Sequence, residues 1–140
     1  MTKTSLSEEM SRLLAIYRDS VLPLRTRQVE LLGRKCRPVR MKTLLGFELQ
    51  LGRKRITCPD LTTARYLSVF AELGVKTIRI PYDPTRTALI LAELEESFAN
   101  LKREAEEEVG GERDLKRQVR GVYRMVRAEL AKSESEILEG

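Results

Sequence analysis

The chain has 140 residues, with 26 Lys and Arg against 21 Asp and Glu, a formal net charge of +5, and 41% hydrophobic residues. That apolar content is sufficient for a packed core and too high for wholesale disorder. Histidine is absent, which excludes histidine-based acid–base catalysis, Ser-His and Cys-His nucleophiles, and histidine metal sites.

No apolar run reaches the roughly 18 residues that span a bilayer, so no transmembrane helix and no membrane partner are expected. Residues 1–9 lack the apolar centre of a secretory leader, which predicts a cytoplasmic protein. A single Asn beside many Arg and Glu is a bias reported for proteins of hot organisms. Drift in a small protein is the alternative explanation.

The N-terminal segment, residues 1–35, is predicted to form one kinked helix. Residues 5–8 fit a capping box, in which a serine hydroxyl and a glutamate each satisfy an unpaired backbone N–H. Apolar residues recur three and four positions apart from Leu6 to Val21, which gives one apolar stripe. Pro23 lacks an amide N–H and is expected to kink or split the helix.

Residues 36–84 are predicted to form a small ββαβ domain. Apolar side chains fall on odd-numbered positions from Val39 to Leu51, which is the pattern of one long, half-buried strand. Gly46 is expected to mark a bulge or bend in that strand. A hairpin turn at 52–54 then leads into a second strand.

Asp60 is a suitable N-cap for a helix over 61–73, and a third strand follows at 75–80. Residues 85–140 are predicted to form an αα-hairpin that turns at Gly110-Gly111, and a coiled coil formed by dimerisation is the alternative. The expected fold class is therefore α+β. A small, mainly antiparallel sheet with one packed helix is flanked by the N-terminal kinked helix and the C-terminal αα-hairpin.

Cys36 and Cys58 are the only thiols. Two thiols without histidine cannot complete a four-ligand zinc site within the chain. Both border the expected sheet, so either a disulfide or two small buried hydrophobic side chains fit the pattern.

Positive charge is concentrated in the first part of the chain. Residues 1–84 carry 16 basic and 8 acidic side chains, a net of +8, and residues 85–140 carry 10 and 13, a net of −3. On the expected long strand, Arg40 and Lys42 point to the face opposite the apolar one. A cationic sheet face beside a protruding basic turn suits contact with a phosphate backbone.

The predicted nucleic-acid-binding residues are Arg34, Lys35, Arg37, Arg40, Lys42, Arg53, Lys54 and Arg55. The same patch also fits a solvated thermophile surface or a surface that faces an acidic protein. The interleaved aromatic side chains on which single-stranded bases stack are missing from it.

A second basic feature lies in the last helix. Its arginines are spaced three and four apart, which gives one basic stripe on an amphipathic helix. We predict that this stripe binds a protein partner or a second copy of the chain through Arg117, Arg120, Arg124 and Arg127. Alternatives are a phosphate backbone, an anionic membrane surface, or pairing with glutamates of the preceding helix. Membrane binding is not expected, because no Trp or Phe borders that face.

Catalytic constellations do not emerge from the sequence. The glycines match neither P-loop nor dinucleotide-binding spacing. Asp60 and Asp83 stand at helix starts, where capping explains them. No catalytic residue, metal ligand or cofactor is predicted.

Residues 39–80 follow the order strand, hairpin strand, short helix, strand. Within them the local pattern is Ile56, Pro59, Ala64, Leu67, Gly74 and Val75. This segment resembles the small β-rich domain of archaeal GINS replication subunits. The resemblance implies a non-catalytic subunit of a replicative helicase assembly, with contacts to helicase and DNA.

The leading expectation is a non-enzymatic basic assembly or adaptor subunit that acts on or near nucleic acid. The first rival is a protein–protein interaction module that dimerises through its long helices. The second is a metal-dependent phosphoryl-transfer enzyme built from carboxylates and arginines. That enzyme would need Asp60, Asp83 or the glutamates of 93–96 to converge on one cleft.

Overall fold

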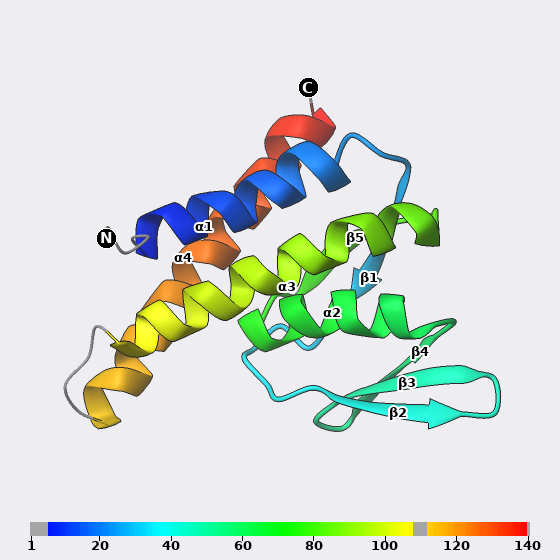
Figure 1. Cartoon of the computed structure of the whole chain (residues 1–140), viewed down its shortest axis with the longest axis horizontal. Helices are drawn as coiled ribbons and strands as arrows, with labels where there is room; N and C mark the ends of the chain where they lie inside the picture. Colours follow the sequence, from blue (N-terminus) through cyan, green and yellow to red (C-terminus); the bar gives the residue numbers. More distant parts are fainter. Residues whose placement is uncertain (1–5, 108–111, 140) are drawn as a thin grey trace. The chain divides into compact units, whose positions relative to one another are not determined.

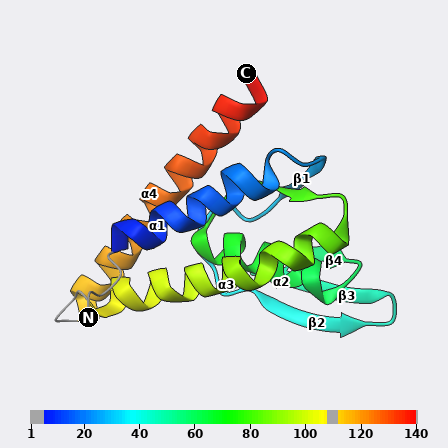
Figure 2. The ribbon, with the colours of Figure 1, turned by 45° about the horizontal axis from the view of Figure 1, so that its top comes forward.

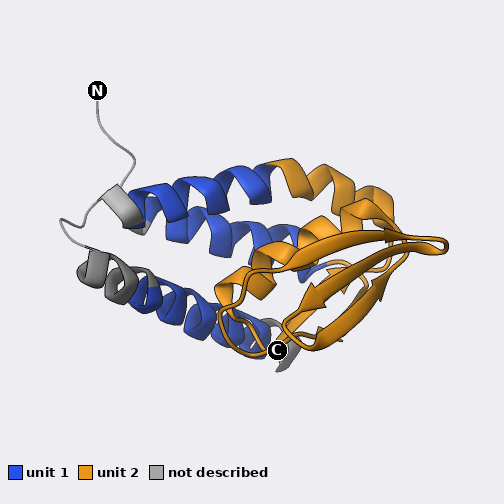
Figure 3. Cartoon of the chain, turned by 90° about the horizontal axis from the view of Figure 1, so that it is seen from below, with its two compact units in different colours: residues 1–23, 93–140 blue, residues 24–92 orange. Residues whose placement is uncertain are grey.

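The computed structural model describes residues 6–107 and 112–139, with side chains described over 8–105 and 120–136. The chain divides into two compact units (Figure 3). Unit 1 comprises residues 1–23 and 93–140, and unit 2 comprises residues 24–92. The described elements are helices and two small antiparallel sheets, so the expected α+β class is confirmed.

Unit 1 begins with helix α1, Leu6–Ala15, which continues as a π-helical segment, η1, Ile16–Val21. The wider turn is closed by the Leu22 amide, which donates to the Tyr17 carbonyl five residues back at 3.0 Å. The helix ends before Pro23, which has no N–H to continue it. The expectation of helix over 1–35 is therefore wrong beyond this proline, and Ser5 of the expected capping box lies outside the described residues.

Unit 1 also contains the C-terminal part of helix α3, Pro84–Glu107, and helix α4, Glu112–Glu139. These are the two long helices that the sequence predicts, and the Gly110-Gly111 turn expected between them lies outside the described residues. Phe98 of α3 and Tyr123 of α4 pack with ring centroids 6.0 Å apart. Figure 1 and Figure 2 both show α1 alongside α4, where Tyr17 donates its hydroxyl to Glu134.

Unit 2 contains two sheets where the sequence predicted one. Strand β1, Thr26–Glu30, pairs antiparallel with β5, Thr77–Pro81. Strands β2, Val39–Thr43, β3, Gly46–Leu51, and β4, Lys54–Cys58, form the second sheet in that order. The third predicted strand, β5, therefore pairs with β1, which lies within the residues that the sequence predicted to be helical.

Helix α2, Leu61–Leu73, packs on the three-stranded sheet and has both of its predicted ends. The Asp60 carboxylate accepts a hydrogen bond from the Thr63 amide at 2.7 Å, which satisfies one unpaired N–H of the first turn. Gly74 ends the helix in the left-handed conformation at φ 87°. Leu67 and Phe70 are buried, as are Leu49 and Leu51 of β3. Each such side chain contributes about 1.5–3 kcal/mol of apolar burial.

The expected long strand over Val39–Leu51 is in fact a hairpin. β2 and β3 are joined by a two-residue turn, Leu44-Leu45, and Thr43 lies opposite Gly46. The turn changes which side chains share a face, because directly opposed residues of an antiparallel pair point to the same side. This change decides where the basic side chains lie.

Candidate nucleic-acid interface

The hairpin places the two basic residues of β2 on the face that the sequence did not predict. Arg40 lies opposite Leu49, and Lys42 lies opposite Phe47, on the side of the sheet that packs against α2. The expectation that Arg40 and Lys42 oppose the apolar face is therefore wrong. Both side chains are nevertheless exposed, because β2 is the outer strand of the sheet.

One face of the three-stranded sheet points away from α2, and this open face is not cationic. It carries Val39 and Met41 of β2, opposite Gln50 and Glu48 of β3. Arg55 of β4 lies opposite Gln50 on the same face, and its Nε lies 3.6 Å from a carboxylate oxygen of Glu48. The single basic side chain among these residues is thus already paired with an acid.

Four of the eight predicted residues come together at one end of the sheet. Three of them, Arg34, Lys35 and Arg37, lie in the connection between β1 and β2, and Arg53 lies in the β3–β4 turn. Val39 pairs with Gln50, so β2 starts where β3 ends. Both segments therefore meet at the same end of the sheet.

Packing contacts hold the β1–β2 connection at that end. The Lys54 ammonium donates to the Leu31 carbonyl at 3.3 Å and lies 3.7 Å from a carboxylate oxygen of Glu30. A Cβ built on Gly52 would lie 3.9 Å from the Leu32 side chain. Lys54 is thus a tether within the protein, which leaves it less available to a ligand than the sequence suggests.

One member of this cluster was missed by the sequence reasoning. A Cβ built on Gly33 would lie 3.5 Å from the Lys76 Cβ, so the exposed Lys76 stands beside the connection. Nothing in the local sequence links it to residues more than forty positions earlier. We call the resulting surface, Arg34, Lys35, Arg37, Arg53 and Lys76, the basic end.

The basic end is largely free of internal neutralisation. Within the described part of the chain, Arg34, Arg37, Arg53 and Lys76 are exposed and have no ion pair or hydrogen bond to another side chain. Unit 2 as a whole carries 14 basic and 5 acidic side chains, a net of +9, whereas unit 1 carries 12 and 16, a net of −4. Positive charge is therefore concentrated in unit 2.

The two thiols are free and serve the packing of unit 2. Cys36 donates its S–H to the Ala71 carbonyl of α2 at 3.4 Å, which fixes the middle of the β1–β2 connection between its flanking cations. Burial raises the pKa of Cys36, Glu72 raises it further, and Arg34 opposes the shift. Burial likewise raises the pKa of Cys58. The structure shows no disulfide between these two described residues: Cys58 is a small buried side chain, as one of the two alternatives has it, and Cys36 is half-buried.

The arginine stripe of α4 is only partly open. Arg120 and Arg124 are exposed, Arg127 is half-buried, and the side chain of Arg117 lies outside the described residues. Arg120 and Arg127 each already interact within the protein. The exposed Met125 lies next to Arg124, so this surface mixes apolar and basic groups.

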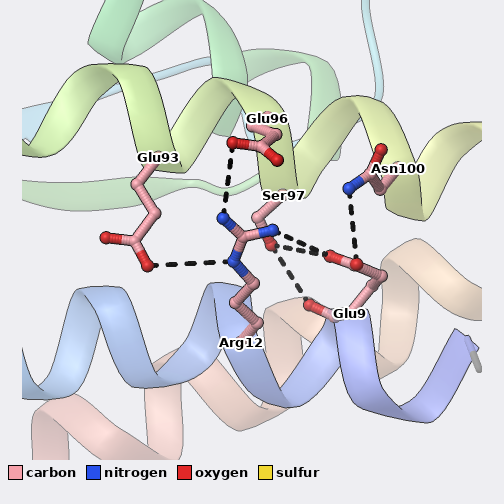
Figure 4. Close-up of polar contacts among 6 residues, drawn as sticks. All are labelled: Glu9, Arg12, Glu93, Glu96, Ser97 and Asn100. Carbon is pink, nitrogen blue, oxygen red and sulfur yellow. Dashed lines mark hydrogen bonds and ion pairs between the residues drawn. The ribbon is translucent and has the colours of Figure 1, made fainter. Parts of the chain in front are cut away.

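The carboxylates considered for catalysis have structural partners. Asp60 caps α2, and Asp83 accepts a hydrogen bond from the Thr85 amide at 2.9 Å in the first turn of α3. Glu93 and Glu96 both pair with Arg12 of α1, at 3.8 and 3.5 Å (Figure 4).

Beside these ion pairs, a buried carboxylate also joins α1 to α3 (Figure 4). Glu9 is 3% exposed. Its carboxylate accepts hydrogen bonds from the Ser97 hydroxyl and the Asn100 amide, each at 3.4 Å, and Arg12 lies 3.8 Å away. A buried polar side chain requires such hydrogen-bond partners, so this cluster serves packing within unit 1.

Two further observations concern the described residues alone. No three Cys, Asp or Glu side chains among them gather as a metal site would require. None of the helices in those ranges combines the length and hydropathy needed to cross a bilayer.

Comparison of the chain with models of protein families, with curated proteins and with solved structures gave no match. The choice of function therefore depends on the residues described above.

Proposed function

We propose that this protein is a non-enzymatic assembly or adaptor subunit that acts on or near nucleic acid, and that the basic end contacts the phosphate backbone. One observation carries the proposal. Four exposed cations at one end of unit 2, Arg34, Arg37, Arg53 and Lys76, have no acidic partner among the described residues. Such groups are placed to neutralise phosphates and release condensed counterions.

Backbone contact predicts binding that is insensitive to base sequence. Phosphates position a protein on a duplex but carry no direct sequence information. The basic end presents point charges from a connection and a turn, and no described helix of unit 2 projects them as a groove-reading element would. Affinity should therefore depend strongly on salt and weakly on sequence.

A role in DNA replication is part of the proposal. It is supported by the resemblance of residues 39–80 to the β-rich domain of archaeal GINS subunits. Within residues 39–80, β3, β4, α2 and β5 follow the order strand, hairpin strand, helix, strand, and β2 precedes them. The last strand, β5, however, pairs with β1.

The test is fluorescence anisotropy of labelled duplex DNA, single-stranded DNA and RNA, titrated between about 50 and 300 mM salt. The test variant changes Arg34, Arg37 and Arg53 to Ala. The matched control changes Arg86, Arg124 and Lys132 to Ala, which removes the same charge from exposed positions elsewhere.

We expect the test variant to lower the log–log salt slope by about 2–3, and the control to leave it nearly unchanged. Equal weakening by both variants would show that net charge alone attracts nucleic acid. No binding by the wild-type protein at the lowest salt would refute the proposal, as would loss confined to one base sequence.

A further inference from the structure

Strand β2 has one edge without a partner. It hydrogen-bonds to β3 on one side, and no described strand pairs with its other side. All five of its residues are exposed, whereas β4, the opposite edge strand, contains the fully buried Cys58 and two half-buried residues. An open edge of this kind offers a row of backbone N–H and C=O groups to an incoming strand.

The same hairpin concentrates exposed apolar side chains. Among the described residues, large hydrophobic side chains are exposed at eight positions, and four of these are Val39, Met41, Leu44 and Leu45. Leu45 in the turn is 90% exposed, and Leu44 is completely so. Figure 1 and Figure 2 show this turn lying beyond the start of α2.

The leucines are not explained by the turn that they form. Two-residue hairpin turns favour Asn-Gly or Gly at positions of positive φ, yet no described non-glycine residue has a positive φ. Residue choices that depart from local preference are expected at functional or strained positions, and these two leucines are open to solvent.

The two flanks of β2 define what could pair with it. The apolar flank, Val39 and Met41, lies on the open face of the sheet, and the basic flank, Arg40 and Lys42, lies on the α2 side. Neither Arg40 nor Lys42 has an ion pair or hydrogen bond to another described side chain. A complementary strand would place apolar residues on the first flank and acidic residues on the second.

A second copy of this chain does not meet that requirement. In each antiparallel self-pairing of β2 centred on Arg40, Met41 or Lys42, the apolar flanks stay together and a cation lies opposite a cation, as Arg40 does with Lys42 when Met41 is central. Like charges directly opposite each other destabilise a strand pair. Registers shifted by one residue place Met41 beside Arg40 instead. The charge pattern therefore favours a different, acidic partner.

We propose that β2 is a docking edge for an extended segment of a partner protein in which acidic and apolar residues alternate. The segment adds as a fourth strand through backbone hydrogen bonds. Its acidic side chains pair with Arg40 and Lys42, its apolar side chains cover Val39 and Met41, and the Leu44-Leu45 turn extends the apolar contact. Only the Leu44-Leu45 turn lies at the opposite end of β3 from the basic end, about 17 Å away. Val39, at the start of β2, adjoins the basic end, so the two surfaces are distinguished by the variants below.

The probe is a capped peptide of alternating glutamate and valine, about eight residues long. A lysine–valine peptide and a glutamate–valine peptide of scrambled order serve as comparisons. Binding is measured by anisotropy, and the bound strand is located by amide hydrogen exchange of β2. We expect the alternating glutamate peptide to bind in preference to both comparisons and to protect amides within Val39–Thr43.

The decisive variant is the double change Arg40→Glu and Lys42→Glu. It should lower the affinity for the glutamate–valine peptide by roughly tenfold, so that the lysine–valine peptide binds more tightly than the glutamate–valine peptide. The matched control, Arg37→Glu with Arg53→Glu, makes the same charge change at the basic end and should keep the original preference. Binding of duplex DNA, measured on both variants, should fall with Arg37→Glu and Arg53→Glu and change less with Arg40→Glu and Lys42→Glu. The two proposals can therefore fail independently.

Several results would overturn the docking proposal. Equal loss of peptide binding in both variants would leave only general charge attraction. Self-association that the glutamate peptide does not displace would make a second copy the occupant. Phosphatidylserine vesicles that protect the Leu44-Leu45 turn, with no peptide binding, would assign the hairpin to a lipid surface.

Discussion

The backbone of Gly46 runs so close to that of Cys58 that a Cβ at Gly46 would lie 2.8 Å from the Cys58 carbonyl oxygen. Gly46 also has φ 140°, a conformation that L side chains rarely adopt. The close approach lets the β2–β3 hairpin lie against the end of β4.

Gly46→Ala should therefore lower the free energy of unfolding by about 1–3 kcal/mol, measured by urea denaturation. The paired control is Gly121→Ala in α4, where an added Cβ meets nothing within 4 Å. That change should raise stability by about 0.5–1 kcal/mol, because alanine favours helix. A neutral effect of Gly46→Ala would contradict the close approach of Gly46 to the Cys58 carbonyl.

The hydroxyl of Tyr66 joins α2 to the two-stranded sheet. It donates to the Arg79 carbonyl at 2.6 Å, and the ring is fully buried. Tyr66→Phe should lower the free energy of unfolding by about 1–2 kcal/mol, because the Arg79 carbonyl loses the Tyr66 hydroxyl as a donor. Tyr82→Phe, at an exposed ring, should change it by less than about 0.5 kcal/mol. Comparable losses from both would contradict the assignment.

The Glu9 cluster of Figure 4 predicts unequal effects for two glutamates that share Arg12. Glu9→Ala removes the acceptor of the Ser97 and Asn100 donors and should destabilise the protein by about 1–3 kcal/mol. Glu93→Ala breaks an exposed ion pair and should cost less than about 0.5 kcal/mol. Thermal unfolding of the two variants decides the question.

The raised pKa values of the two thiols predict that the free energy of unfolding depends on pH in the alkaline range. Their pKa values are raised by burial above the ordinary 9.0, so the unfolded chain loses these protons first. The stability that they contribute is complete below pH 9 and declines as pH rises towards the raised values. Urea denaturation from neutral to alkaline pH should show a smaller decline after Cys36→Ala and Cys58→Ala are combined, and an unchanged decline would refute this.

The same burial predicts slow alkylation of both thiols by iodoacetamide, since the thiolate is the reactive form. Cys36, which is half-buried, should react before the fully buried Cys58. Mass spectrometry of peptides after timed quenching gives the order. Faster reaction at Cys58 would place that residue in a more open environment than the one described.

Local signals were sufficient where a few adjacent residues determine the structure. Helix α2 begins after Asp60 and ends at Gly74, as the capping preferences of these two residue types predict. The apolar seam of α3, including Leu94, Phe98 and Leu101, is buried as its spacing indicates. In these cases the determining contacts lie within one or two helical turns, which a sequence pattern records directly.

The sequence predictions fail where residues far apart in the chain determine the local structure. Thr26–Glu30 contains a single buried apolar residue, Val29, and becomes a strand because Ile78 lies opposite it, almost fifty positions later. The Leu44-Leu45 turn lacks every usual turn residue, so uninterrupted alternation over 39–51 concealed it. Because this turn was not predicted, Arg40 and Lys42 were assigned to the wrong face of the three-stranded sheet, and the predicted nucleic-acid site was wrong for these two residues.

The ladder between β1 and β5 pairs the first strand of unit 2 with its last strand, which precedes α3, the helix along which the chain passes from unit 2 into unit 1. Beside this ladder, the Tyr82 amide donates to the Arg25 carbonyl at 3.0 Å. Residues 26–81 are in this sense closed at their ends by a two-stranded stem, and in sequence unit 2 lies between the two segments of unit 1. Insertions with adjoining ends can be lengthened, shortened or replaced without rerouting the host chain. Evolution can thus vary the length and sequence of the strongly cationic segment between β1 and β5 while the rest of the polypeptide keeps its course.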